Sequence, residues 1–165
     1  MNPIRVTAPA GPVVTLADLK THLRVVGDHD NAHITSLEAA AVAHLDGWRG
    51  VLGRCILEQQ WAVTYPEAGV WRLPFPDVTA VTAIDGSGDP VDATLKHDSL
   101  GALVEINEPA TVTLTAALPE DALASVQVAI KIWVKARYDD AEGPAMVAAD
   151  AAFQALIGAL RSVRV

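Results

Sequence analysis

The spacing in this chain that comes nearest to a metal-binding pattern is a pair of histidines four residues apart. His29 and His33 stand beside Asp28 and Asp30, and on a helix, side chains at i and i+4 share one face. The sequence His-Asp-Asn-Ala-His lacks the glutamate that serves as general base in zinc proteases, and we expect His29 to precede the helix. We therefore predict a solvated helix start without a metal or cofactor. A metal-dependent enzyme using His29 and His33 is the alternative.

Other catalytic patterns are missing from the sequence. It has no Gly-x-Ser-x-Gly elbow and no phosphate-binding loop of the Walker type. Gly86-Ser87-Gly88 is typical of a turn, and the single cysteine, Cys55, is expected to be a small buried side chain. We predict that the protein is not an enzyme. A small soluble ligand-binding module built on the β-rich part remains the other alternative.

The net charge of −8 lies in one internal stretch. From Glu58 to Asp121 the chain has eleven acidic and two basic residues, whereas the remainder is close to neutral. This balance disfavours a protein that coats DNA by neutralising phosphates, although DNA could still pass such a surface. A helix-turn-helix regulator spanning Leu16 to Trp48 is also disfavoured, because its second helix carries Glu38 and Asp46 and almost no base before Arg49.

The order of patterns predicts an α+β fold, with a helical core of two N-terminal and two C-terminal helices and an inserted small antiparallel β-module. We expect an extended N-terminal arm over 1–14, because its prolines and Gly11 block regular structure, and a single domain over 15–165. The helices are predicted within 15–53 and 119–161, and the β-insert within about 56–117. No apolar run is long enough to cross a membrane, so we expect no membrane partner.

The first two helices have recognisable boundaries. Thr15 is predicted to cap the first, with Asp18 as its partner, and either Asp28 or Asp30 is predicted to cap the second. An apolar stripe from Ile34 to Trp48 defines the second helix. We expect Gly50 and Gly53 to end it.

The insert is predicted to contain five or six short strands. Alternation marks Trp61 to Tyr65, and apolar or β-branched runs mark four further segments, which are Val70 to Leu73, Val78 to Ile84, Leu103 to Ile106 and Val112 to Ala116. Residues 85–90 form a strong turn signal. The connections are too short for crossover helices, so antiparallel pairing is expected.

The third helix is apolar on more than one side. Pro119 suits its first position, and the breadth of its apolar surface predicts contacts with neighbouring subunits. The residues assigned to such an interface are Trp133, Ile130, Ile132 and Val128. A final helix carries Phe153 and Ile157 and ends in a basic tail.

Five segments in this order resemble the head–tail connector (adaptor) proteins of tailed bacteriophages, including the version carried by phage-derived gene transfer agents. The segments are Thr15 to Val25, Ser36 to Ala41, Arg54 to Trp61, Leu73 to Ile84 with its Leu-Pro-Phe-Pro start, and Pro119 to Tyr138. The chain departs from this pattern after Arg137, where an acidic Gly-Pro loop and an extra helix follow.

The resemblance implies a ring of about twelve copies in the neck of a virion or phage-like particle, assembled in the bacterial cytoplasm. The ring would join the portal protein to a head-completion (stopper) or other neck protein and let DNA through without sequence-specific binding. It implies no catalytic residue. We further expect Asp85, Asp89 and Asp92 to border the DNA channel, and Arg161, Arg164 and Val165 to dock on the portal.

Overall fold

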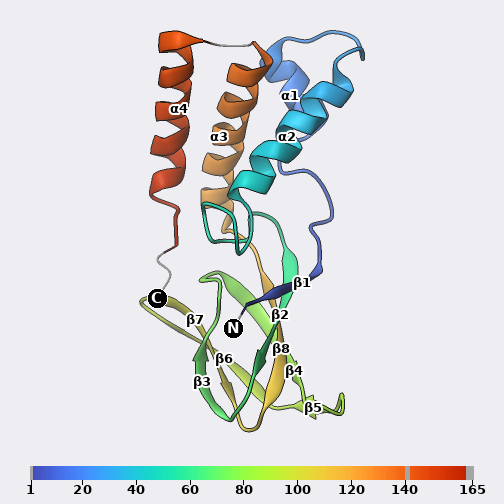
Figure 1. The fold of residues 1–165 in the computed structure, drawn as a ribbon, viewed down its shortest axis with the longest axis vertical. Coiled ribbons are helices and arrows are strands. Elements are labelled where there is room, and N and C mark those ends of the chain that lie inside the picture. The colour runs from blue at the N-terminus through green and yellow to red at the C-terminus, as the bar shows by residue number, and fades with distance from the viewer. Residues whose placement is uncertain (1, 140–141, 163–165) are drawn as a thin grey trace.

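The computed structural model describes residues 2–139 and 142–162, and it divides into a helical half and a β-half (Figure 1). The two N-terminal and two C-terminal helices lie together, and two antiparallel sheets formed by the chain between them and by the N-terminal arm occupy the other end. The predicted α+β class is confirmed.

Helix α1 (Leu16–Leu23) begins as the sequence predicts. Thr15 has an extended backbone, and its hydroxyl oxygen accepts a hydrogen bond from the Asp18 N–H at 3.2 Å. The same hydroxyl donates to the Asp18 carboxylate at 2.7 Å. The helix ends at Arg24, which adopts the left-handed conformation with φ of 59°. This conformation turns the chain toward the second helix.

Helix α2 (Asn31–Leu45) differs from the prediction at both ends. Asp30 occupies the cap position, but its backbone is not extended and its side chain bonds no helix N–H. It accepts a hydrogen bond from the Tyr138 hydroxyl instead. At the other end the helix stops at Leu45, so the predictions of a stripe through Trp48 and of an end at Gly50 and Gly53 are wrong. Gly47, with φ of +76°, turns the chain there, and a Cβ atom on it would lie 3.0 Å from the Trp61 ring.

Helices α3 (Glu120–Tyr138) and α4 (Gly143–Gly158) complete the helical half. Figure 1 shows α3 between α4 on one side and α1 with α2 on the other. Pro119 precedes α3 as its cap residue rather than occupying the first helical position. Phe153 and Ile157 of α4 are buried against the other helices, as the apolar spacing predicts.

A five-stranded antiparallel sheet has the order β1-β2-β8-β4-β5, with β1 (Ile4–Thr7) and β5 (Pro90–Val91) at its two edges. Its central members, β2 (Gln59–Tyr65), β8 (Ala110–Ala116) and β4 (Val78–Ile84), are the strands whose alternation or β-branching is clearest in the sequence. A second sheet has the order β3-β7-β6, formed by β3 (Gly69–Arg72), β7 (Gly101–Ile106) and β6 (Ala93–Asp98).

Three strands in the described part of the chain were not predicted: β1 (Ile4–Thr7), β5 (Pro90–Val91) and β6. The arm was expected to lack regular structure, yet Pro3 and Pro9 flank β1 instead of interrupting it. Strand β6 reads Ala-Thr-Leu-Lys-His-Asp and is largely exposed, so it carries little hydrophobic alternation. Its antiparallel pairing with β7 holds it as a strand, which its own sequence pattern does not predict.

Two separate hydrophobic cores stabilise the molecule. The helical core gathers buried residues from all four helices and from the segments that flank them, whereas the β-core lies between the two sheets. The connecting segments are tied together by backbone bonds, such as that from Leu118 N–H to the Cys55 carbonyl at 2.8 Å. The Arg54 guanidinium also donates to the Asp77 carboxylate across this junction.

Candidate functional surfaces

The two histidines of the metal hypothesis lie in different environments. His29 is exposed and its Nε2 is 3.1 Å from the Asp30 carboxylate, whereas the His33 ring packs beside the Tyr138 ring with centroids 6.0 Å apart. Within residues 2–139 and 142–162, no group of three or more potential metal ligands is gathered. In that same part of the chain, no helix is long and apolar enough to span a bilayer.

The two acidic residues that disfavour a helix-turn-helix regulator are Glu38 of helix α2 and Asp46, which follows the helix. Glu38 faces inward and is buried, and its Oε1 accepts hydrogen bonds from the Val13 and Val14 N–H groups. Asp46 accepts bonds from the Ile56 N–H and from the Gln59 side chain. Both carboxylates that looked unfavourable for DNA binding therefore serve to hold neighbouring segments of the chain.

The four residues assigned to a subunit interface do not share one surface. Ile130 is fully buried in the helical core, so its placement at an interface is wrong. Trp133 is half-buried beneath the Arg137 guanidinium, whose carbon lies 3.7 Å from the ring centroid. Val128 is half-exposed, and Ile132 is partly exposed. The sequence marks α3 as broadly apolar, but packing by α4 and α2 already covers much of that surface.

The exposed side of α3 carries cations beside its apolar residues. Lys131 and Lys135 alternate with Val128 and Ile132 at helical spacing. They lie close enough to His22 of α1 that its pKa is lowered, chiefly by partial burial and further by the two ammonium groups. This side of the helical half is therefore mixed in character.

The acidic residues assigned to a DNA channel lie in and after the turn between β4 and β5, at the end of the molecule opposite the helices (Figure 1). Asp85 organises that turn, because its Oδ1 accepts the Ser87 and Asp89 N–H groups at 2.8 and 2.9 Å. These bonds lower its pKa. Asp89 and Asp92 are exposed. Asp85 thus has a structural role in the turn, whereas Asp89 and Asp92 lie at the surface.

Only part of the predicted portal-docking tail can be placed. Arg161 is exposed and donates to the Gln154 side chain at 2.6 Å, whereas Arg164 and Val165 fall outside the described residues. Ser162 fixes the end of the described chain, since it donates from its N–H to the Leu52 carbonyl and from its hydroxyl to the Gly53 carbonyl.

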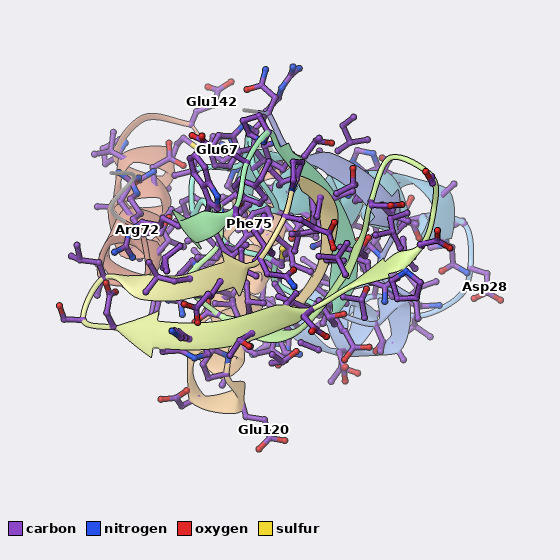
Figure 2. All side chains as sticks on the ribbon, turned by 90° about the horizontal axis from the view of Figure 1, so that it is seen from below. Asp28, Glu67, Arg72, Phe75, Glu120 and Glu142 are labelled. Carbon is purple, nitrogen blue, oxygen red and sulfur yellow. The ribbon has the colours of Figure 1, made fainter. Side chains whose placement is uncertain are left out.

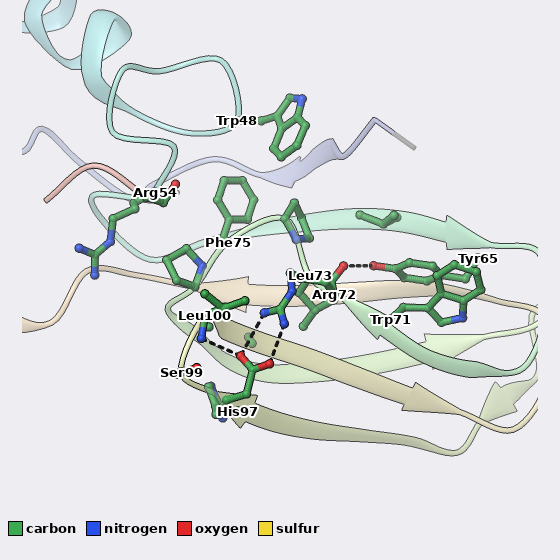
Figure 3. Close-up of a pocket in the computed structure, with 17 residues that line it drawn as sticks. Trp48, Arg54, Tyr65, Trp71, Arg72, Leu73, Phe75, His97, Ser99 and Leu100 are labelled. Carbon is green, nitrogen blue, oxygen red and sulfur yellow. Dashed lines mark hydrogen bonds and ion pairs between the residues drawn. The ribbon is translucent and has the colours of Figure 1, made fainter. Parts of the chain in front are cut away.

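A cleft of about 710 Å³ beside the second sheet is a feature that the sequence did not reveal (Figure 3). Trp48 and Phe75 lie at one end, and the stacked Tyr65 and Trp71 rings at the other. Burial raises the pKa of Tyr65 to about 12. Phe75 is fully buried, and seen from below it lies near the middle of the molecule. In the same view Asp28, Glu120 and Glu142, which are not part of the cleft, project from the edge (Figure 2). The Leu73-Pro74-Phe75-Pro76 segment is the signal in the sequence closest to this cleft.

The charged side chains Arg54, Arg72 and Asp98 of the cleft are engaged in ion pairs. Arg72 forms a two-pronged contact with the Asp98 carboxylate, with distances of 3.1 and 2.6 Å. This contact and the Leu100 N–H lower the pKa of Asp98 to about 2. Arg54 is likewise paired with Asp77. The cleft therefore presents a concave aromatic surface, whereas its ion pairs hold neighbouring loops together.

A second cleft, of about 680 Å³, separates the N-terminal arm from α2 and the start of the β-half. Pro3, Pro9 and Pro12 line it on the arm side, and Val42 and Leu57 line it on the body side. Figure 1 shows the arm passing along the outside of the molecule from β1 to α1. The arm is therefore attached at its two ends, with a hollow between.

No protein-family model matches this chain, and no curated protein does. The fold is shared with a chain of the solved structure "Neck of empty GTA particle computed with C6 symmetry", at a TM-score of 0.68 and 22% sequence identity. The superposition covers 100% of this chain and 97% of that one. At this identity the likeness establishes a common fold.

Proposed function

We propose that this chain is a structural head–tail connector that forms a ring beneath the portal in the neck of a tailed phage or gene transfer agent. The observation that carries the proposal is the full-length likeness to a chain from a GTA particle neck, in which almost nothing of either chain is left unmatched. An inserted catalytic domain would leave such a remainder.

The side-chain chemistry supports a role without catalysis. The Cys55 thiol is buried, and burial together with the nearby Asp46 carboxylate raises its pKa, so it is a poor nucleophile. In the aromatic cleft Arg72 pairs with Asp98, and Arg54 pairs with the neighbouring Asp77. Function then resides in shape and surface, as it does for proteins that act by assembly.

Ring closure supplies the physical reason for two different outer surfaces. Identical subunits arranged head to tail need two complementary faces on each copy. The mixed cationic and apolar side of α3 and the acidic β-half offer surfaces of opposite character. A ring of about twelve copies is compatible with the sixfold symmetry of the matched neck, because twelve is a multiple of six.

The proposal is tested by removing the gene from a producing phage or gene transfer agent. We expect DNA-filled heads without attached tails, and complementation with the intact gene should restore complete particles. Image averages of necks carrying a labelled copy should show the label as a ring next to the portal. Complete, infectious particles that lack this protein would contradict the proposal.

We also propose that the acidic end of the β-half, which carries Asp85, Asp89 and Asp92, borders the DNA path. Like charge keeps DNA from adhering to such a surface. Asp89→Lys with Asp92→Lys should slow DNA ejection, whereas Asp85 is left intact because its carboxylate holds the turn. Charge reversal at Glu142, which is exposed at the start of α4 in the helical half, serves as the control. Unchanged ejection by the double variant would refute this assignment.

A third element of the proposal is that the tail from Arg161 to Val165 binds the portal protein. Truncation after Leu160 should abolish portal capture in a pull-down. Truncation after Ser162 is the matched control, because it keeps the Ser162 hydrogen bonds to Leu52 and Gly53 while removing Arg164 and Val165. Loss of capture in both variants assigns binding to the last three residues, and full capture by both excludes the tail.

A further inference from the structure

The aromatic cleft of about 710 Å³ borders the point where the described chain ends (Figure 3). Ser162 is one of the residues that line the cleft, and it is partly buried. Its N–H donates to the Leu52 carbonyl at 2.9 Å and its hydroxyl donates to the Gly53 carbonyl at 3.1 Å, so the chain is held at this point. The residues that follow Ser162 therefore start at the wall of the cleft.

The surface of this cleft suits an apolar occupant. Trp71 is only partly buried, and Leu100, which also lines the cleft, is 54% exposed. The polar groups of two aromatic side chains are already bonded within the chain. The Tyr65 hydroxyl donates to the Arg72 carbonyl at 3.3 Å, and the Trp71 indole N–H donates to the Glu67 carbonyl at 3.2 Å. An occupant is therefore held mainly by contact with apolar and aromatic surface.

The three residues after Ser162 have a composition that matches such a surface. They are Val163, Arg164 and Val165, and they lie outside the described residues. Side chains two apart in an extended segment point the same way, so both valines can face the cleft while Arg164 faces solvent. The Asp98 side chain, 40% exposed at the same cleft, carries the charge opposite to that of Arg164. Three extended residues reach up to about 10 Å, so this segment can contact only surface near Ser162.

We propose that Val163 and Val165 occupy the aromatic cleft of their own chain before assembly, with Arg164 directed toward solvent. This seating does not depend on the connector role, because it needs only one copy of the chain. Its consequence rests on the proposed function, in which the same three residues bind the portal. The cleft and the portal then compete for the tail, so the cleft keeps the tail covered until a portal is present.

Methyl NMR of the full chain tests the seating directly. The methyl signals of Val163 and Val165 are assigned by their loss in the Val163→Ala and Val165→Ala variants. Valines seated against aromatic rings should have signals shifted upfield from those of unstructured valine, equally at low and high protein concentration. Signals at the unstructured position would overturn the proposal. A shift that appears only at high concentration would assign the cleft to the tail of another copy and would also overturn it.

A disulfide between the tail and the cleft gives an independent measurement. Leu100→Cys is combined with Val165→Cys, and the effective concentration of the two new thiols is measured in glutathione buffers. The matched control combines Val165→Cys with Val70→Cys, because Val70 is 53% exposed and lies outside the cleft. Cys55 is buried and stays in both variants. Seating predicts an effective concentration at least tenfold higher for the Leu100 pair, and equal values would contradict it.

Portal capture separates the seating from the role of the tail in the connector. Shifted valine signals together with normal capture by the chain truncated after Ser162 would keep the seating and refute portal binding by the tail. Unstructured signals together with lost capture would do the reverse. Leu100→Asp should release the tail and raise the apparent affinity for the portal, by about tenfold if nine tenths of the tails are seated. Val70→Asp is the control, and equal affinities of the two variants would refute the competition.

Discussion

Among the described residues, the buried set of the helical core includes one aromatic ring, that of Phe153, whereas the buried set of the β-core includes Trp61, Tyr65 and Phe75. Aliphatic and alanine side chains suffice where helices pack closely in one layer. Two sheets that face each other leave a wider space, which large rings fill. The helical half therefore depends on many small contacts, and the β-half on a few large ones.

The largest expected effect comes from emptying the centre of the β-core. Phe75 is fully buried and its ring contacts the Trp61 and Trp48 rings, with centroids 5.2 and 6.4 Å away. Phe75→Ala should lower the free energy of unfolding by about 4 kcal/mol, because it removes buried apolar surface and leaves a cavity. Urea unfolding followed by tryptophan fluorescence measures the loss. Val70→Ala, on the exposed side of β3, should change the midpoint little.

The second largest effect on stability is expected at the junction between the helical half and the β-half. The Arg54 guanidinium donates to both Asp77 oxygens and, at 3.2 Å, to the Leu160 carbonyl, and the pair is mostly buried. Arg54→Met should destabilise the chain by about 3 kcal/mol, since Asp77 is left without its counterion. A double-mutant cycle with Asp77→Asn should reveal strong coupling. Additive effects would show that this ion pair does not couple the two halves.

Loss of the arm's anchor should have a smaller effect. Glu38→Ala leaves the Val13 and Val14 N–H groups without their buried acceptor, and we expect a cost of about 2 kcal/mol. Hydrogen exchange at these two amides should accelerate more than exchange within α3. Glu38→Gln is the control, because its amide oxygen can still accept. Protection unchanged in the alanine variant would mean that the arm is held elsewhere.

The smallest effect concerns acid sensitivity of the β-half. The Arg72 contact and the Leu100 N–H hold the pKa of Asp98 at about 2, below its ordinary 3.8. A depressed carboxylate pKa contributes stability above the ordinary pKa and loses it as the pH falls toward 2. Arg72→Met should raise the Asp98 pKa, which NMR titration of its carboxyl carbon measures. The stability difference from the unaltered chain should vanish near pH 2. An unmoved titration would show that the backbone N–H dominates.

The helical half could be predicted closely because its signals are local. Thr15 and Asp18 mark the start of α1 by themselves, and the apolar spacing locates α3 and α4. The errors arose where distant contacts decide. The Asp30 side chain bonds Tyr138 across 108 positions of sequence instead of capping α2. Trp48 lies beyond the helix, after the turn at Gly47 with its positive φ, which faces the distant Trp61 ring. Ile130 is as apolar as Val128, and only the packing of other helices buries one and not the other.

The sequence by itself determined the α+β class, the position of the insert, the acidic balance and the strands with clear alternation, because each depends on composition or on neighbours a few residues apart. The tertiary structure decided which carboxylates face water, where the arm joins the sheet, and how the aromatic residues border a cleft. These features depend on pairings between residues far apart in the chain, such as Arg5 with Trp61 or Arg54 with Asp77. No local pattern encodes such pairings, since the energy that selects them exists only when both partners are in place.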